Sequence, residues 1–301
     1  MKKLFAALAG AGLLVSGPAQ AQSDASVFRP NSAWAADYGD EYCRLIREFS
    51  DGNEAITLML QRVQPGADSQ LILIGNALRP FRGATELGWS FLPNQAERKS
   101  IFARSEAGNG QQYLRLDNVL LTPPAPPAPG AGFTPPPPYD RAAEQTAAKA
   151  LTGVAVTAGL TRPVRIETGA LDGPIAAMQA CTDDLLKTWG LDADKHKTLS
   201  SPAIAPFSPG WIPTGTIPFS EFAKFAGGGN QVRLLLDPGG KPTSCHIHSP
   251  TLSKALNDRI CQLLMEKAAF TPAKDASGEA IASFWMGSPM FLGPPMGGGR
   301  R

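Results

Sequence analysis

The sequence predicts an α+β protein: a β-rich, sandwich-like N-terminal domain with one helix, followed by a small unit of a β-hairpin, a helix and a further strand. Short runs of β-forming residues recur between residues 42 and 121. An amphipathic helical pattern follows at 171–189, and a strand–turn–strand–helix–strand pattern spans 231–286. A change of periodicity in this order favours separate β-rich and mixed units over an alternating α/β fold.

The first residues are typical of a cleavable secretory signal peptide, which we assign to residues 1–21. Two lysines precede an uncharged apolar run over 4–15, and Ala19–Ala21 fits the small-x-small cleavage pattern. An uncleaved membrane anchor is the alternative, but a spanning helix needs about 20 apolar residues and this run is shorter. We therefore expect a mature chain that begins near Gln22 and lies outside the cytoplasm.

Charge and composition exclude some partners. The chain has 28 Lys and Arg against 26 Asp and Glu, and the predicted signal peptide removes two lysines, which leaves the charges balanced. A neutral chain has no general attraction for nucleic acid or for an anionic membrane. We expect no binding to nucleic acid and contact with a membrane only through a partner protein; no small-molecule substrate is evident from the sequence.

Residues 22–191 are predicted to form the N-terminal domain. In 55–63 the apolar residues alternate partly, as in strands buried on one face and partly covered on the other. Recurring strands of this kind suggest a sandwich or a curled antiparallel sheet. The predicted strands are 42–49, 55–63, 70–78, 86–91, 100–103, 113–121 and 164–167.

A proline-rich segment, 122–138, interrupts these strands. Nine of the sixteen residues from Pro123 to Pro138 are proline, which cannot donate hydrogen bonds to a sheet. We interpret the segment as a loop inserted in the domain, because a strand and a helix follow it; a linker between domains is the alternative.

The helix predicted at 171–189 has Pro174 in its first turn and Gly190 just after its end. Residues 192–215 are rich in Pro, Ser and Thr and are interpreted as a linker or an extended wrapping segment.

The C-terminal unit begins with a hairpin. Strands at 231–236 and 241–249 flank the turn Asp237–Gly240, and a helix with Thr251 as its N-cap is predicted at 251–268. A last strand covers 280–286, and a flexible Gly/Pro tail covers 290–301.

Four cysteines in an oxidising compartment predict two disulfides. Cys245 and Cys261 lie close together within one unit, so we pair them, which leaves Cys43 for Cys181. Two other connectivities, or four buried free thiols, are the alternatives.

The C-terminal pattern resembles the C-terminal domain of the TonB family over residues 216–289. The resemblance rests on the strand VRLLLD, the turn PGGKP, Phe270-Thr271-Pro272-Ala273, the turn Asp275–Gly278 and the aromatic strand SFW. In that family the last strand is a sheet edge that pairs with the TonB box, an extended segment of outer-membrane transporters. The resemblance implies a periplasmic protein that binds its partner by strand addition, through Ala282, Ser283, Phe284 and Trp285.

The N-terminal half is also similar to the invasion-associated locus B type of periplasmic protein. The similarity rests on Trp34–Tyr38, Tyr42-Cys43 and the Gly-Ala-Leu-x-Gly-Pro-Ile stretch that begins at Gly169.

A cleavable N-terminus and a short proline-rich segment differ from an energy transducer, which keeps a membrane helix and a long spacer. The alternative function is therefore an envelope structural or interaction protein that uses the same unit without energy transduction.

No enzyme motif supports catalysis. GxSxG, HExxH and P-loop patterns do not occur in the sequence. His246 and His248 share one face of a strand and would bind zinc with a third ligand, but a solvated face is the commoner reason for this spacing. Asp183 and Asp184 are interpreted as the exposed side of a helix. We expect no enzyme, no cofactor and no metal.

Overall fold

The computed structural model describes residues 25–122, 138–206, 210–213, 231–248 and 253–288. The protein is a mixed α+β structure that is mostly β, which confirms the predicted class. The predicted signal peptide, nearly all of the proline-rich segment and the Gly/Pro tail lie outside the described residues.

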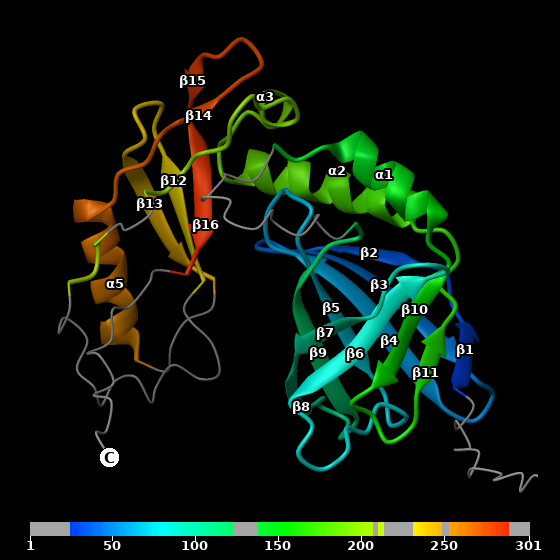
Figure 1. Cartoon of the computed structure of the whole chain (residues 1–301). Helices are drawn as coiled ribbons and strands as arrows, with labels where there is room; N and C mark the ends of the chain where they lie inside the picture. Colours follow the sequence, from blue (N-terminus) through cyan, green and yellow to red (C-terminus); the bar gives the residue numbers. More distant parts are fainter. Residues whose placement is uncertain (1–24, 123–137, 207–209, 214–230, 249–252, 289–301) are drawn as a thin grey trace, which may run out of the picture.

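One large, curled sheet of eleven strands forms most of the structure (Figure 1). Its path runs β7-β6-β10-β11-β1-β3-β4-β5-β9-β8, with β2 paired to β3, and its pairs are antiparallel except for β1 with β11. The strands at the two ends of the path, β7 and β8, are joined in sequence by the buried Phe102 alone, so the sheet must curl until its ends nearly meet. The strands are β1 Ser26–Pro30, β2 Ala35–Tyr38, β3 Cys43–Ser50, β4 Ala55–Arg62, β5 Ser69–Ile74, β6 Glu86–Leu92, β7 Arg98–Ile101, β8 Ala103–Glu106, β9 Gln112–Val119, β10 Gly153–Ala158 and β11 Val164–Ile166.

Strand β4 shows how the sequence fills this sheet. Its buried positions alternate strictly, and Ile56, Leu58 and Leu60 point into the core. The same alternation also places Arg62 inside, where its side chain has no exposed surface. A buried guanidinium requires an anion and hydrogen-bond acceptors.

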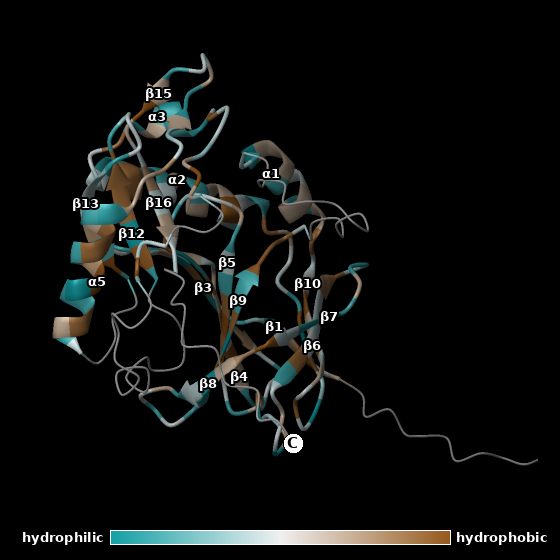
Figure 2. Ribbon diagram, turned by 60° about the vertical axis from the view of Figure 1, so that its left-hand side comes forward, coloured by the Kyte–Doolittle hydropathy of each residue, from teal (hydrophilic) through white to brown (hydrophobic). Residues whose placement is uncertain are grey.

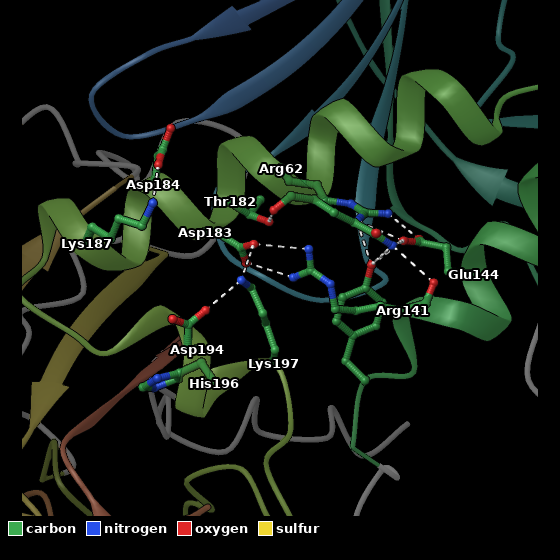
Figure 3. A network of polar contacts seen from close by, with 12 residues as sticks. Arg62, Arg141, Glu144, Thr182, Asp183, Asp184, Lys187, Asp194, His196 and Lys197 are labelled. Atoms are coloured by element: carbon green, nitrogen blue, oxygen red, sulfur yellow. Dashed lines mark hydrogen bonds and ion pairs between the residues drawn. The ribbon is translucent and has the colours of Figure 1, made fainter.

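Helix α1 (Arg141–Ala150) supplies that anion (Figure 3). Both carboxylate oxygens of Glu144 accept hydrogen bonds from Arg62. Tyr139 donates to Glu144, and Gln179 donates to Tyr139 at 3.0 Å and to Glu144 at 3.1 Å. Ser69 accepts from Nε of Arg62 at 2.9 Å. The network therefore joins the sheet to α1 and to α2 (Asp172–Thr188), which carries Gln179.

Helix α2 agrees with the predicted 171–189 and lies with α1 across one end of the sheet (Figure 1). Gly190 follows it with φ +77°, the left-handed conformation expected after a helix end. The disulfide between Cys43 and Cys181 ties β3 to this helix.

The sequence pattern places Asp183 on the exposed side of its helix, and for this residue of α2 the expectation is wrong. Its side chain is buried rather than exposed, and it accepts two hydrogen bonds from Arg141 at 2.7 and 3.1 Å (Figure 3). Of the two aspartates, Asp184 is the exposed one, and its Oδ1 lies 3.0 Å from Nζ of Lys187.

A second, three-stranded sheet has the order β13-β12-β16 and is antiparallel throughout. Its strands are β12 Val232–Leu236, β13 Pro242–Ile247 and β16 Ser283–Gly287. Helix α5 (Lys254–Lys267) packs on one face, and the disulfide between Cys245 and Cys261 joins it to β13. The outward side of α5 is largely hydrophilic in Figure 2. Its N-cap is Ser253; Thr251, the predicted cap, lies outside the described residues.

The hairpin turn depends on one glycine. Gly240 has φ +80°, and a Cβ at this position would lie 2.2 Å from the carbonyl oxygen of Phe270. The carbonyl of Gly240 also accepts from the N–H of Phe270 at 3.1 Å, so the turn is fixed against the segment that follows α5.

The last predicted strand, 280–286, is divided at Ala282. β15 (Ala280–Ile281) pairs with β14 (Ala273–Lys274), whereas β16 pairs with β12. The stretch interpreted as a linker or wrapping segment contains the short helix α3 (Ala193–His196). Farther along, isolated antiparallel β-bridges join Ser201 to Lys274 and Ile204 to Thr271.

We expect Glu144→Ala to lower the free energy of unfolding by about 3–5 kcal/mol, because it leaves the Arg62 charge buried without its anion. Asp184→Ala, which removes an exposed ion pair, is the matched control and should change stability by less than about 0.5 kcal/mol. Urea denaturation of both variants measures the difference, and equal small losses would contradict a structural role for the buried pair.

The two disulfides should differ in their effect. Replacing Cys43 and Cys181 by serine opens a loop with a sequence separation of 138, against 16 for Cys245 and Cys261. Chain entropy gives roughly 4–5 kcal/mol for the long loop and about 3 kcal/mol for the short one. Denaturant midpoints of the two double variants test this order, and the reverse order would disprove it.

Candidate functional site

The three-stranded sheet is covered on both faces. Val232, Leu234 and Trp285 pack towards α5 in the second hydrophobic core. On the opposite face Leu235, Phe284 and Met286 pack against the core of the large sheet. A partner therefore reaches this sheet at its edges rather than on a free face.

Strand β16 is one of those edges. It pairs with β12 from Val232↔Gly287 to Leu236↔Ser283. Among the residues that the structure describes, no backbone group pairs with the other side of β16.

The hydrogen-bond pattern shows which groups face outward. The N–H of His248 donates to the carbonyl of Gln231, so Gln231 and His248 form a hydrogen-bonded pair. In an antiparallel ladder every second pair is of this kind, and the register continues along β12 and β13. Arg233 and Leu235 thus point their backbone groups to β13, and the intervening residues of β12 point theirs to β16. By the same alternation, Phe284 and Met286 direct their N–H and C=O groups to the open edge.

The four residues expected to bind a partner lie at this edge, but the side chains of three of them are buried or packed against other rings. Ala282 lies just before β16 and is exposed. Ser283 is buried, Phe284 is 5.3 Å from Trp189 between ring centroids, and Trp285 is 5.7 Å from Trp211. Within β16, Phe284 is the one of these residues whose backbone groups face outward, because the backbone groups of Ser283 and Trp285 pair with β12.

His196 on α3 supports the start of β16. Its Nδ1 is 2.7 Å from the carbonyl oxygen of Asp192 and its Nε2 is 3.1 Å from Oγ of Ser283. A carbonyl only accepts, so the neutral tautomer with hydrogen on Nδ1 satisfies both contacts. The ring also stacks on Phe284 at 6.1 Å, and burial lowers its pKa, although Asp192 opposes that shift.

A second polar cluster lies near the opposite edge. Arg233 on β12 is buried, stacks over Trp189 with its guanidinium carbon 4.2 Å from the ring centroid, and donates to both carboxylate oxygens of Glu41. Nε2 of His246 is 3.8 Å from the same carboxylate. His246 and His248 therefore lie beside Glu41, which is in the connection between β2 and β3, and part of the His246 side chain is exposed to solvent.

The electrostatics of this cluster follow from burial and Arg233. Burial alone would raise the pKa of Glu41, but the hydrogen bond and charge of Arg233 hold it below its usual value. Burial and the neighbouring His246 lower the pKa of His248. Glu41 is thus an anion and His248 a neutral imidazole near pH 7.

Of the three residues here that could bind a metal ion, Glu41 is the one that the sequence did not indicate. It lies 192 residues before Arg233 in the chain, and no local motif marks it. Glu41, His246 and His248 are the residues of the described chain that could together hold a metal ion.

No family model, curated protein or solved structure matches this chain. Both disulfides are consistent with a secreted protein. Among the described residues, no helix has the length and apolar character needed to cross a membrane.

We expect stability to fall as the pH drops from 7.5 to 5.5, in part through His196. Its folded-state pKa is lowered, so near pH 6 the unfolded chain binds more protons, and acid favours unfolding. His196→Gln keeps a polar side chain and should make the denaturation midpoint less dependent on pH. Some pH dependence should remain in this variant, because the pKa of His248 is also lowered in the folded state. An unchanged pH dependence in the variant would show that His196 does not contribute.

Proposed function

We propose that this protein binds an extended segment of a partner protein by adding it as a strand to the open edge of β16. The observation that carries the proposal is the strand order β13-β12-β16, which leaves the outward groups of Phe284 and Met286 without a backbone partner in the described chain. Edge groups of this kind bind an incoming strand through main-chain hydrogen bonds.

The two edges of the sheet differ in a way that favours β16. β13 begins with Pro242 and its register shifts between Leu235 and Leu236, and both features discourage strand pairing. β16 reads SFWMG, with neither proline nor charge, and its register with β12 is regular. Its own sequence and register therefore provide none of the proline, charge or bulge that commonly protects an edge strand.

Packing also prepares β16 for binding. Phe284 and Trp285 are held on opposite faces by Trp189 and Trp211, so the strand is already in the conformation that pairing requires. A preformed edge loses less conformational entropy on binding than a mobile edge does.

The partner class follows from the resemblance to TonB C-terminal domains: the TonB box of an outer-membrane transporter, met in the periplasm. The second candidate is an envelope interaction protein that pairs with another strand. A TonB-box peptide and a scrambled peptide of equal composition separate the two: binding of the first alone supports the transporter role, and equal binding supports the second.

Met286→Pro tests the edge directly. The N–H of residue 286 faces away from β12, so proline removes this outward N–H and leaves the hydrogen bonds to β12 intact. Edge strands tolerate proline at positions of this kind. Met286→Ala removes the same side-chain contacts but keeps the N–H. We expect the proline variant to bind the peptide at least about tenfold more weakly than the alanine variant, or about 1.4 kcal/mol.

Amide NMR supplies the matching readout. On addition of peptide, the amides of 284 and 286 should gain protection from hydrogen exchange, whereas those of β13 should not. Protection of these amides before peptide is added would mean that the chain already covers this edge, and the proposal would be wrong.

A further inference from the structure

The side chains of Glu41, His246 and His248 converge although they come from distant parts of the chain. Each offers one ligand atom, and these atoms lie within 4.8 Å of one another. His246 on β13 and His248 just after it are two residues apart along extended chain, so they point to the same side, and the loop before β3 brings Glu41 opposite them.

Two imidazoles and a carboxylate form a donor set that suits Zn²⁺. Zinc binds histidine nitrogen and carboxylate oxygen at about 2.0–2.2 Å, which places tetrahedral ligand atoms roughly 3.3 Å apart. The cluster is somewhat wider, so it must close slightly. His246 and Glu41 have side-chain exposures of 39% and 35%, and this freedom allows small rotations towards a shared ion.

His248 supplies an independent observation. Its Nδ1 is buried and has no hydrogen-bond partner within the part of the chain that the structure describes. An unsatisfied buried nitrogen is costly, and coordination of a metal is one way to satisfy an imidazole.

Arg233 is compatible with this site. A carboxylate oxygen has more than one lone pair, so Glu41 can accept from Arg233 and still coordinate an ion. Hydrogen bonds of this type orient ligating carboxylates in metal sites. The guanidinium is itself fixed over Trp189, 4.2 Å from the ring centroid.

We propose that Glu41, His246 and His248 bind a divalent transition-metal ion, best fitted by Zn²⁺, between β13 and the β2–β3 connection. Three protein ligands leave a fourth position for water or for a group from a partner. The inference does not depend on strand addition at β16, which involves another edge of the sheet.

Calorimetric titration of the untagged chain with Zn²⁺ tests the site. Cysteine does not compete, because all four cysteines are in disulfides. We expect one equivalent to bind, and each of His246→Gln, His248→Gln and Glu41→Gln to weaken binding at least about tenfold. His196→Gln, which replaces the third histidine of the chain, is the matched control and should bind as the parent does.

Histidine side-chain ¹⁵N NMR of the unmodified chain keeps the test independent of whether the variants fold. Added Zn²⁺ should shift the ring nitrogens of His246 and His248 and leave those of His196 unchanged. Failure to bind, binding equal in all variants, or a shift of His196 alone would overturn the proposal.

Discussion

The contact between Trp189 and the inner face of the three-stranded sheet positions both of the sites that we propose. The indole lies 5.3 Å from the ring of Phe284 on β16 and 4.2 Å from the guanidinium carbon of Arg233 on β12. Arg233 in turn holds Glu41 beside His246. One aromatic side chain at the end of α2 thus positions both the open edge and the histidine cluster.

That indole is itself held by the buried interior of the large sheet. Three contacts fix helix α2. They are the disulfide to β3, the ion pair of Asp183 with Arg141, and the hydrogen bond that Gln179 donates to Glu144, the partner of Arg62. Lys197, which follows α3, also lies 3.7 Å from Asp183 (Figure 3). Such charges cost more to bury than hydrophobic residues would, but once paired they fix the direction of the helix.

Local patterns in the sequence predicted much of the fold, and the Cys43–Cys181 disulfide was also predicted, but the buried charged contacts between distant residues were missed. The alternation in β4, the turn at Gly240 and the glycine after α2 are set by neighbouring residues, so they could be read directly. Helix α1 was missed because its buried side includes the charged Glu144, which breaks an apolar pattern. Glu41 was missed for a different reason: its partners are on β12 and β13, and only the packing of the two sheets brings them together.

The open edge and the histidine cluster use different atoms of the same sheet. The edge depends on backbone groups of Phe284 and Met286, whereas the cluster depends on side chains that point from β13 to the β2–β3 connection. Strand β12 lies between them, and its Arg233 turns its backbone to β13 and its side chain to Glu41. A strand added to β16 would extend the sheet away from the cluster, and an ion would join β13 to the larger unit without covering β16. The two proposed roles are therefore independent, and failure of one leaves the other standing.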